Sequence, residues 1–248
     1  MISQTALDNI RIVLVSPTHP GNIGATARAM KTMGIKQLYL VKPKRFPDPQ
    51  ADERAAHAVD ILANAKVVET LPQALQGCTL AYGTSARSRA LPWPLQDVRP
   101  AAAQAVQEAV VAKIAFVFGR EHAGLTNEEL ELCQRQILIP TSPDYSSLNL
   151  AAAVQIVCYE IYSAWLVQQP LLEEIVNDET TDWATAEEIE LFYEHLEQVM
   201  ITVQFTKPGV SGLVMPRLRR LFGRARLTKT EINILRGFLT TLQKQLPS

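Results

Sequence analysis

The segment IRIVLVSPTHPGNIGATARAM, residues 10–30, contains the two signals that decide the fold. Its first six residues are aliphatic apart from Arg11, which is typical of a buried strand. From Asn22 onward the pattern is helical, and a helix is predicted over residues 22–33 with Gly34 as its C-cap. A buried strand followed directly by a helix predicts a parallel sheet that helices cover.

The same alternation continues through the first two thirds of the chain. Strands are expected at residues 10–15, 37–41, 66–68, 79–82, 113–118 and 136–139. Helices are expected between them, at residues 22–33, 50–63, 71–76, 101–111 and 126–132. The last of these begins with Thr126-Asn127-Glu128-Glu129, the pattern of a capping box. The fold class predicted from this order is α/β, with helices on both faces of a parallel sheet.

A long helix that begins near Ser147 is apolar on more than one face as far as Trp165. Such a helix needs more than one surface to cover it. One side is expected to pack on the sheet and another on a second copy of the chain, which predicts a homodimer. A helix enclosed within one subunit is the alternative.

The composition changes after Gln168-Gln169-Pro170, where the chain becomes acidic and irregular up to Asp182. We interpret residues 1–168 as the α/β domain, 169–182 as a linker and 183–248 as a small all-α extension. Helices are expected there at residues 183–205, at 215–222 and from a capping box at Thr228 to about Gln245.

The net charge is only -1, but basic residues are concentrated in this extension. Between residues 207 and 236 the sequence has Arg217, Arg219, Arg220, Arg224, Arg226, Lys229 and Arg236, against a single Glu231. A cluster of this kind predicts contact with the phosphate backbone of a nucleic acid, and a solvated helix face is the alternative.

Several classes of protein are excluded or disfavoured. Cys78, Cys133 and Cys158 are odd in number and far apart, which indicates buried thiols rather than disulfides or zinc ligands, and the four histidines have no metal-ligand spacing. We find no signal peptide and no stretch that is long and charge-free enough to span a bilayer, so a cytoplasmic protein without metal or membrane is expected. Nicotinamide, P-loop and G-x-S-x-G motifs are absent from the sequence.

Three polar clusters follow three of the apolar runs: Asn22, Gly24 and Arg28; Gly119-Arg120-Glu121; and Ser146-Ser147-Leu148-Asn149. Ligands of open α/β sheets bind beyond the carboxyl ends of the strands, so the clusters predict one composite site. Arg28 is expected about one and a half turns into its helix. Alternatively, Asn22 simply caps the helix and Arg28 lies on a solvated helix face.

Three motifs of the chain resemble those of SPOUT-superfamily 2′-O-ribose methyltransferases. They are Asn22-x-Gly24-x-x-x-Arg28, Phe118-Gly119-Arg120-Glu121-x-x-Gly124-Leu125 and Ser147-Leu148-Asn149-Leu150. The resemblance covers residues from about 10 to 165. Residues 216–227 and 231–237 resemble the C-terminal extension of the TrmJ branch, which methylates the ribose of nucleotide 32, the first of the tRNA anticodon loop.

The resemblance implies a trefoil knot at the C-terminal end of the α/β domain and S-adenosylmethionine as the cofactor. The cofactor-binding residues that it implies are Thr84, Ser85, Ala86, Gly119, Ile139, Ser146, Ser147 and Leu148. The catalytic residues that it implies are Arg28, Asn22, Glu121, Ser147 and Asn149. RNA contacts are expected from Arg28 and from Arg217, Arg219, Arg220, Arg224 and Arg226, in a homodimer that acts on tRNA.

A guanidinium is a poor base at neutral pH, so Arg28 is expected to clamp a phosphate while phosphate or water accepts the ribose proton. Asn22 would position Arg28 or the ribose, and Glu121 would hold the loops or orient Arg28. The family precedent places Arg28 across the dimer. The competing hypotheses are a ribosomal RNA methyltransferase of the same superfamily and a non-catalytic RNA-binding protein.

Overall fold

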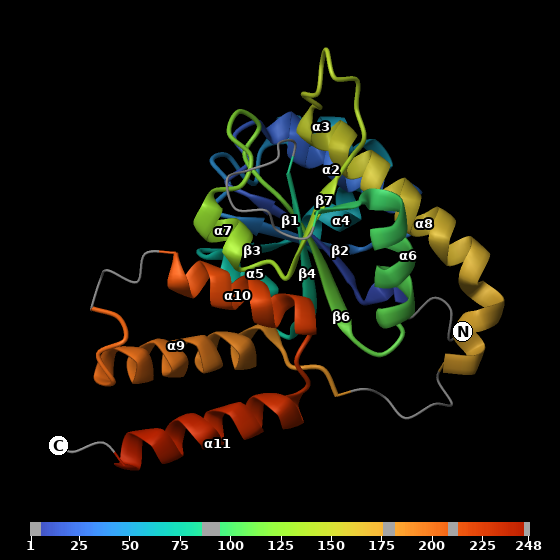
Figure 1. Cartoon of the computed structure of the whole chain (residues 1–248). Helices are drawn as coiled ribbons and strands as arrows, with labels where there is room; N and C mark the ends of the chain where they lie inside the picture. The colour runs from blue at the N-terminus through green and yellow to red at the C-terminus, as the bar shows by residue number, and fades with distance from the viewer. Residues whose placement is uncertain (1–5, 86–94, 176–181, 208–212, 246–248) are drawn as a thin grey trace. The chain divides into compact units, whose positions relative to one another are not determined.

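The computed structural model describes residues 6–85, 95–175, 182–207 and 213–245, with the backbone alone for 169–175 (Figure 1). The chain divides into two compact units, Met1–Thr180 and Thr181–Ser248. The predicted α/β domain and the predicted helical extension fall in the first and second unit respectively.

The first unit is built on a sheet whose strand pairs are all parallel among the described residues. The strands are β1 (Ile10–Val15), β2 (Gln37–Val41), β3 (Lys66–Val68), β4 (Cys78–Thr84), β5 (Leu95–Asp97), β6 (Lys113–Phe118) and β7 (Arg135–Leu138). Their order in the sheet is β3-β2-β1-β6-β4-β7-β5. The predicted parallel sheet is confirmed, and the edge strand β5 is added to it. The trefoil knot stays a prediction.

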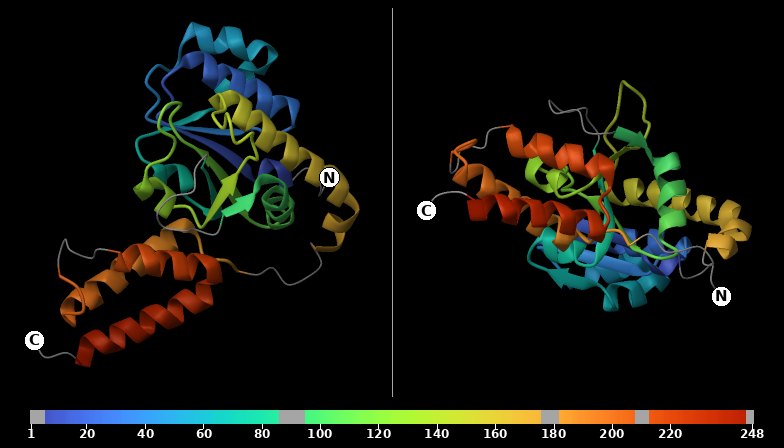
Figure 2. Two further views of the ribbon diagram at one scale, coloured as in Figure 1. Left: turned by 45° about the horizontal axis from the view of Figure 1, so that its top comes forward. Right: turned by 60° about the horizontal axis from the view of Figure 1, so that its bottom comes forward.

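Helices cover both faces of the sheet, as predicted (Figure 2). Ile12 and Leu14 of β1 lie in one core with helices α2 (Pro20–Thr32), α6 (Val98–Glu108) and α8 (Leu150–Ile175). On the other face, Arg11 donates hydrogen bonds to the carbonyls of Ala74 and Gln76, at the end of α5 (Leu71–Leu75). Its guanidinium also lies 3.9 Å from the ring centroid of Tyr39, so this buried cation has partners.

The helix predicted over residues 50–63 is broken into three pieces. They are α3 (Pro49–Ala55), the 3-10 turn η1 (Ala56–Ala58) and α4 (Val59–Ala63). Ala56 has a φ of 50°, which ends α3. A Cβ at Gly24 would lie 2.0 Å from the carbonyl oxygen of Ala51, so α3 packs directly on the backbone of α2.

Helix α8 differs from prediction in length and in hydropathy. It continues to Ile175, into the segment that was predicted to be a linker. Its part Leu150–Gln168 has a mean hydropathy of 1.5 and is long enough to cross a bilayer, contrary to the sequence-based expectation. Val154, Val157 and Ile161 of this helix are completely buried in the core of the first unit, which accounts for part of the apolar composition.

The strand order reverses direction between β1 and β6. β2 and β3 lie on one side of this pair, whereas β4, β7 and β5 lie on the other. Leu14 is paired with Phe118, so the two strands end at the same level of the sheet. In parallel sheets this switch point opens the crevice in which ligands bind.

The second unit is a bundle of α9 (Ala186–Thr202), α10 (Val214–Ala225) and α11 (Lys229–Gln245), which confirms the three predicted helices. The ring of Phe222 packs edge-on against Phe192, with centroids 5.0 Å apart. Thr228 and Glu231 form the predicted capping box, with Glu231 accepting from the Thr228 amide at 2.8 Å. The unit therefore has its own apolar core.

Candidate active site

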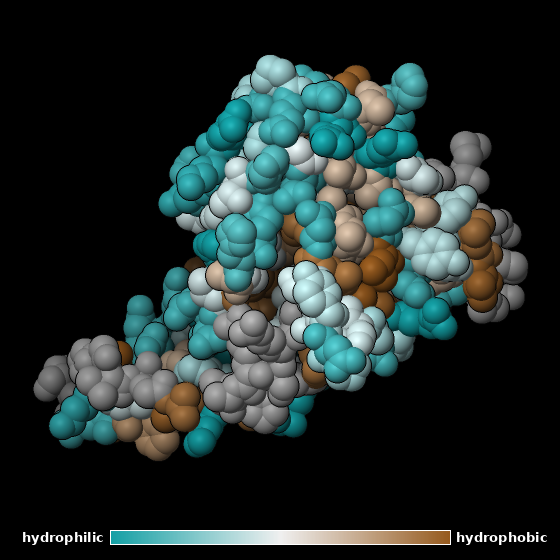
Figure 3. Space-filling model, turned by 90° about the horizontal axis from the view of Figure 1, so that it is seen from above, coloured by the Kyte–Doolittle hydropathy of each residue, from teal (hydrophilic) through white to brown (hydrophobic). Residues whose placement is uncertain are grey.

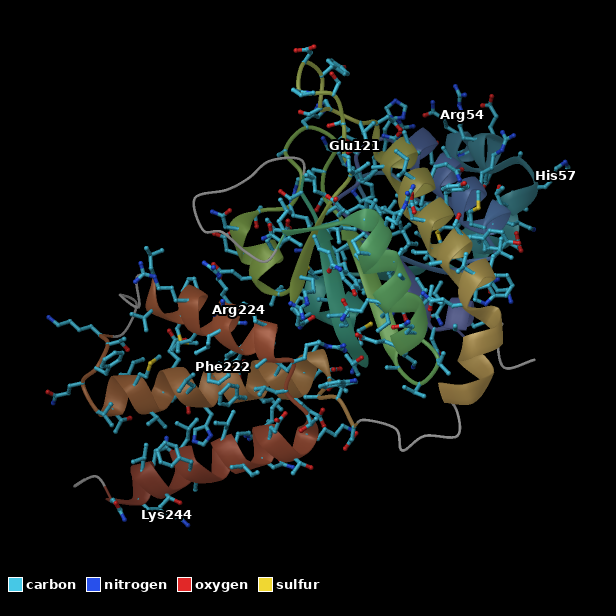
Figure 4. All side chains as sticks on the ribbon, turned by 45° about the vertical axis from the view of Figure 1, so that its right-hand side comes forward. Arg54, His57, Glu121, Phe222, Arg224 and Lys244 are labelled. Carbon is cyan, nitrogen blue, oxygen red and sulfur yellow. The ribbon has the colours of Figure 1, made fainter. Side chains whose placement is uncertain are left out.

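The carboxylate of Glu121, just after β6, holds the loop that follows β1 (Figure 4). It accepts hydrogen bonds from the Thr18 amide at 3.1 Å, the Thr18 hydroxyl at 2.9 Å and the His19 amide at 3.1 Å. Burial raises the pKa of this carboxyl, but hydrogen bonds from Asn22, Thr18 and His19 outweigh burial and lower the pKa to about 2. Glu121 is therefore ionised at neutral pH and its oxygens are fully engaged.

Asn22 connects this carboxylate to the start of α8. Its Nδ2 donates to Glu121 at 3.1 Å, and its Oδ1 accepts from Nδ2 of Asn149 at 3.0 Å. Asn149 in turn accepts from the amide of Ala151 at 2.9 Å and so caps α8. We call Thr18, Asn22, Glu121 and Asn149 the Glu121 network. It brings together three of the five predicted catalytic residues from three separate motifs.

The other two predicted catalytic residues lie outside this network. Arg28 is exposed on α2, and among the described residues its guanidinium has no hydrogen-bond or ion-pair partner. Because α2 begins at Pro20 rather than at Asn22, Arg28 lies about two turns into the helix, further than predicted. Ser147 is exposed in the loop before α8.

Arg120 forms a second connection that the motif comparison did not single out. Its guanidinium makes a two-point ion pair with Glu129, with both N–O distances 2.9 Å. Glu129 is also the capping-box residue of α7 (Asn127–Glu131), where it accepts from the Thr126 amide at 2.8 Å. The predicted capping box is confirmed, and its carboxylate also fastens α7 to the loop after β6. The charged residues of the Gly119-Arg120-Glu121 triplet indicated an ion pair at this position. Only the tertiary structure identifies Glu129 as the partner of Arg120.

The predicted cofactor residues come from the ends of three neighbouring strands, β6, β4 and β7. The Thr84 hydroxyl donates to the Val117 carbonyl at 3.0 Å, and the Ser85 amide donates to the Ile137 carbonyl at 3.0 Å. Ile139 is half-buried just after β7, whereas Ser146, Ser147 and Leu148 are exposed in the following loop. Ala86 lies outside the described residues.

Gly119 is required by its own loop. A Cβ at this position would lie 2.0 Å from the carbonyl carbon of Gly124, because the chain folds back there. The amide and carbonyl of Arg120 pair with the carbonyl and amide of Gly124 at 3.1 and 2.9 Å. Glycine is therefore needed here for the close approach of backbone to backbone.

The five predicted RNA-binding arginines of the second unit separate into two groups. Arg219 is paired with Glu190 at 2.6 Å and lies over the ring of Tyr193, while Arg226 lies over the ring of Trp183. Arg217, Arg220 and Arg224 have i, i+3, i+7 spacing on α10, which places them on one face. We call these three residues the basic stripe. Phe222 points toward α9 and Arg224 lies on the other side of α10 (Figure 4).

Within the described residues, no group of three or more His, Cys, Asp or Glu side chains is arranged to hold a metal ion. Cys78, Cys133 and Cys158 are buried thiols, as predicted. Burial raises the pKa of the Cys133 thiol to about 12, which keeps this thiol protonated and unreactive.

The switch-point site and its three motifs define a methyltransferase class. The chain belongs to the SpoU rRNA Methylase family, whose model matches residues 9–159. A second family model, described as "tRNA methyltransferase TrmJ, C-terminal domain", matches residues 187–248. Together they cover both units of the structure.

Individual relatives resemble the chain over nearly its whole length. The tRNA (cytidine/uridine-2′-O-)-methyltransferase TrmJ of Sodalis glossinidius is 53% identical over 96% of this chain and 92% of that protein. The tRNA (cytidine/uridine/adenosine-2′-O-)-methyltransferase TrmJ of Pseudomonas aeruginosa is 50% identical over 96% of this chain and 95% of that protein. The crystal structure of TrmJ from Z. mobilis has a TM-score of 0.81 at 31% identity and covers 94% of this chain and 98% of that one.

Proposed function

We propose that this protein transfers a methyl group from S-adenosylmethionine to the ribose 2′-hydroxyl of nucleotide 32 in the tRNA anticodon loop. The observation that carries the proposal is the Glu121 network, which joins three separate motifs at the switch point. The names of the relatives from Sodalis and Pseudomonas support tRNA rather than ribosomal RNA as the substrate.

The residues at the strand ends fit S-adenosylmethionine. Thr84, Gly119 and Ile139 stand at the ends of three adjacent strands, where backbone groups and half-buried apolar side chains can hold an adenosyl group. The cofactor supplies an activated methyl group when it is bound. The neighbouring loop of Ser146, Ser147 and Leu148 is exposed, so it is accessible to a ligand.

The geometry divides the catalytic work between positioning and phosphate binding. Glu121 has a pKa of about 2 and is saturated with hydrogen bonds, so it holds the loops and does not accept the ribose proton. Asn22 uses its amide within the network, which leaves Arg28 free to bind a phosphate. Holding the ribose in line with the methyl group is then the main source of rate enhancement, and phosphate or water takes the proton.

The apolar surface of α8 supports a homodimer. Tyr159, Leu166 and Val167 are 54%, 50% and 78% exposed, although they lie on a helix of the core. Figure 3 shows hydrophobic side chains gathered on one side of the first unit, within a largely hydrophilic surface. A second copy that covers this surface would bring its own Arg28 to the site, as family precedent implies.

The second unit supplies RNA contacts through the basic stripe in this proposal. Arg217 and Arg224 are exposed, and phosphate groups would relieve the repulsion between neighbouring guanidinium groups. Arg219 and Arg226 also contribute to the packing of their own unit, and their predicted contact with RNA stays a prediction. A cytoplasmic location follows from the substrate.

The test is methyl transfer from labelled S-adenosylmethionine to unmodified tRNA and to ribosomal RNA, in buffer with a metal chelator. We expect one 2′-O-methyl group in tRNA, mapped to nucleotide 32 by mass spectrometry. Methylation of ribosomal RNA alone would support the other methyltransferase hypothesis. Tight tRNA binding without transfer would support the non-catalytic one.

A further inference from the structure

Tyr145 has the most exposed aromatic side chain among the described residues, at 76%. It lies in the loop between β7 and α8, which projects from the first unit (Figure 1). We propose that the ring of Tyr145 stacks on a nucleobase of the RNA, at or next to the nucleotide whose ribose is methylated. The inference rests on the proposed function and adds a residue that holds the substrate.

The loop presents this ring in a defined position. The Tyr145 amide donates to the Ser142 carbonyl at 3.2 Å, and the Asp144 amide donates to the Ser142 hydroxyl at 3.3 Å. Pro143 occupies the second position of this four-residue turn, where its fixed φ is favourable. A ring on such a turn loses little conformational entropy when it binds a flat ligand.

The ring is also close to the catalytic residues. Tyr145 precedes Asn149 by four residues, which span at most about 14 Å even when fully extended. Asn149 is fixed by its bonds to Asn22 and to the amide of Ala151. Tyr145 is therefore within reach of the target nucleotide and of its neighbours in the strand.

The substrate needs such a surface. Single-stranded RNA loops are recognised with their bases unstacked, and exposed aromatic side chains replace the lost stacking. Stacking on a ring tolerates every base, because every base has a π-face. Tyr145 would hold the nucleotide while leaving the identity of its base open, and Arg28 would hold a phosphate of the same strand.

The experiment compares Tyr145→Phe with Tyr145→Leu in the full-length protein. Phenylalanine keeps the ring, whereas leucine keeps an apolar side chain of similar reach without a π-face. The probes are anticodon stem-loop RNAs with 2-aminopurine at nucleotide 32 or at one of its neighbours, because stacking quenches this fluorophore. Binding of S-adenosylmethionine is titrated separately, and light scattering reports the oligomeric state.

We expect wild-type protein and Tyr145→Phe to quench the fluorescence of at least one probe. Tyr145→Leu should lose the quenching and bind RNA about 5- to 150-fold more weakly, the range that corresponds to one stacked base. Its affinity for S-adenosylmethionine and its oligomeric state should not change.

Equal RNA affinity and equal quenching in Tyr145→Leu would overturn the inference. Weaker cofactor binding would place the ring on the cofactor instead, and a change in oligomeric state would place it in a subunit interface; both also overturn it. The fluorescence is measured when the RNA binds, before any methyl group is transferred, so the result does not depend on catalysis. If wild-type protein binds with quenching but does not methylate tRNA, it is the proposed function that fails.

Discussion

Glu121 shows how one carboxylate can fix a site without taking part in proton transfer. It accepts hydrogen bonds from Asn22 and from the backbone of Thr18 and His19, across two loops. Because the folded-state pKa of about 2 is below the ordinary value of 4.5, the ionised form stabilises the native state. This contribution is complete above about pH 4.5 and is lost as the pH falls toward 2.

We therefore expect Glu121→Gln to lower the melting temperature at pH 7, and the difference from wild type to shrink as the pH falls from 5 to 3. Glu53→Gln, at an exposed position of α3, is the matched control and should show no such trend. Melting curves followed by circular dichroism provide the measurement. A difference that is independent of pH would mean that the charge of Glu121 does not matter to the fold.

Arg28 is predicted to act on the RNA alone. Arg28→Ala should abolish methyl transfer in single-turnover reactions while the affinity for S-adenosylmethionine, measured by calorimetry, changes less than about twofold. Arg28→Lys should recover only part of the rate, because an ammonium cannot bind a phosphate at two points. A parallel loss of cofactor affinity would show that the guanidinium supports the structure of the site instead.

At the scale of the elements, two helical glycines are expected to respond in opposite ways. Gly24 has no room for a Cβ against α3, whereas nothing lies within 4 Å of a Cβ at Gly237 in α11. Gly24→Ala should destabilise the first unit by about 1–3 kcal/mol, and Gly237→Ala should stabilise the second by about 0.5–1 kcal/mol. Chemical denaturation of each variant gives both values. A Gly24→Ala protein of wild-type stability would show that α2 and α3 can separate at no cost.

The arginines of α10 provide the other test at this scale. Replacing Arg217 and Arg224 with Gln should flatten the salt dependence of tRNA affinity by about one to two units, since each lost phosphate contact removes nearly one unit. Arg219→Gln should instead destabilise the second unit by about 1–3 kcal/mol, because its bonds to Glu190 are lost. The filter-binding slope and the unfolding midpoint separate these effects. An unchanged slope for the double variant would identify the basic stripe as a solvated face.

For the whole molecule, the two units are predicted to divide the work. A fragment of residues 1–182 contains all four residues of the Glu121 network. It should therefore bind S-adenosylmethionine with unchanged affinity. Its Michaelis constant for tRNA should rise at least tenfold, because the phosphate contacts of the second unit are gone. Steady-state kinetics at two salt concentrations provide the measurement. A fragment with an unchanged Michaelis constant would show that the second unit is not an RNA-binding element.

Local signals in the sequence were sufficient for most of the elements. Buried strands such as β1 and β6 are continuous aliphatic runs, and the capping boxes at Thr126 and Thr228 mark the starts of their helices. Strand β5 was missed because Leu95, Gln96 and Asp97 form no apolar run and pair only at the edge of the sheet. The break at Ala56 was missed because alanine gives no sign of a positive φ.

The sequence by itself determined the class of the fold and the three motifs of the site, because periodicity and motif spacing are properties of the chain. The tertiary structure decided which of those residues meet. Only the parallel pairing of β1 with β6 brings Glu121 to Thr18 and Asn22, across about a hundred residues of chain. Likewise, only the packing of α10 on α9 pairs Arg219 with Glu190 while Arg217 and Arg224 stay exposed. A run of arginines looks uniform along the chain, but a helix directs each side chain to a different neighbour.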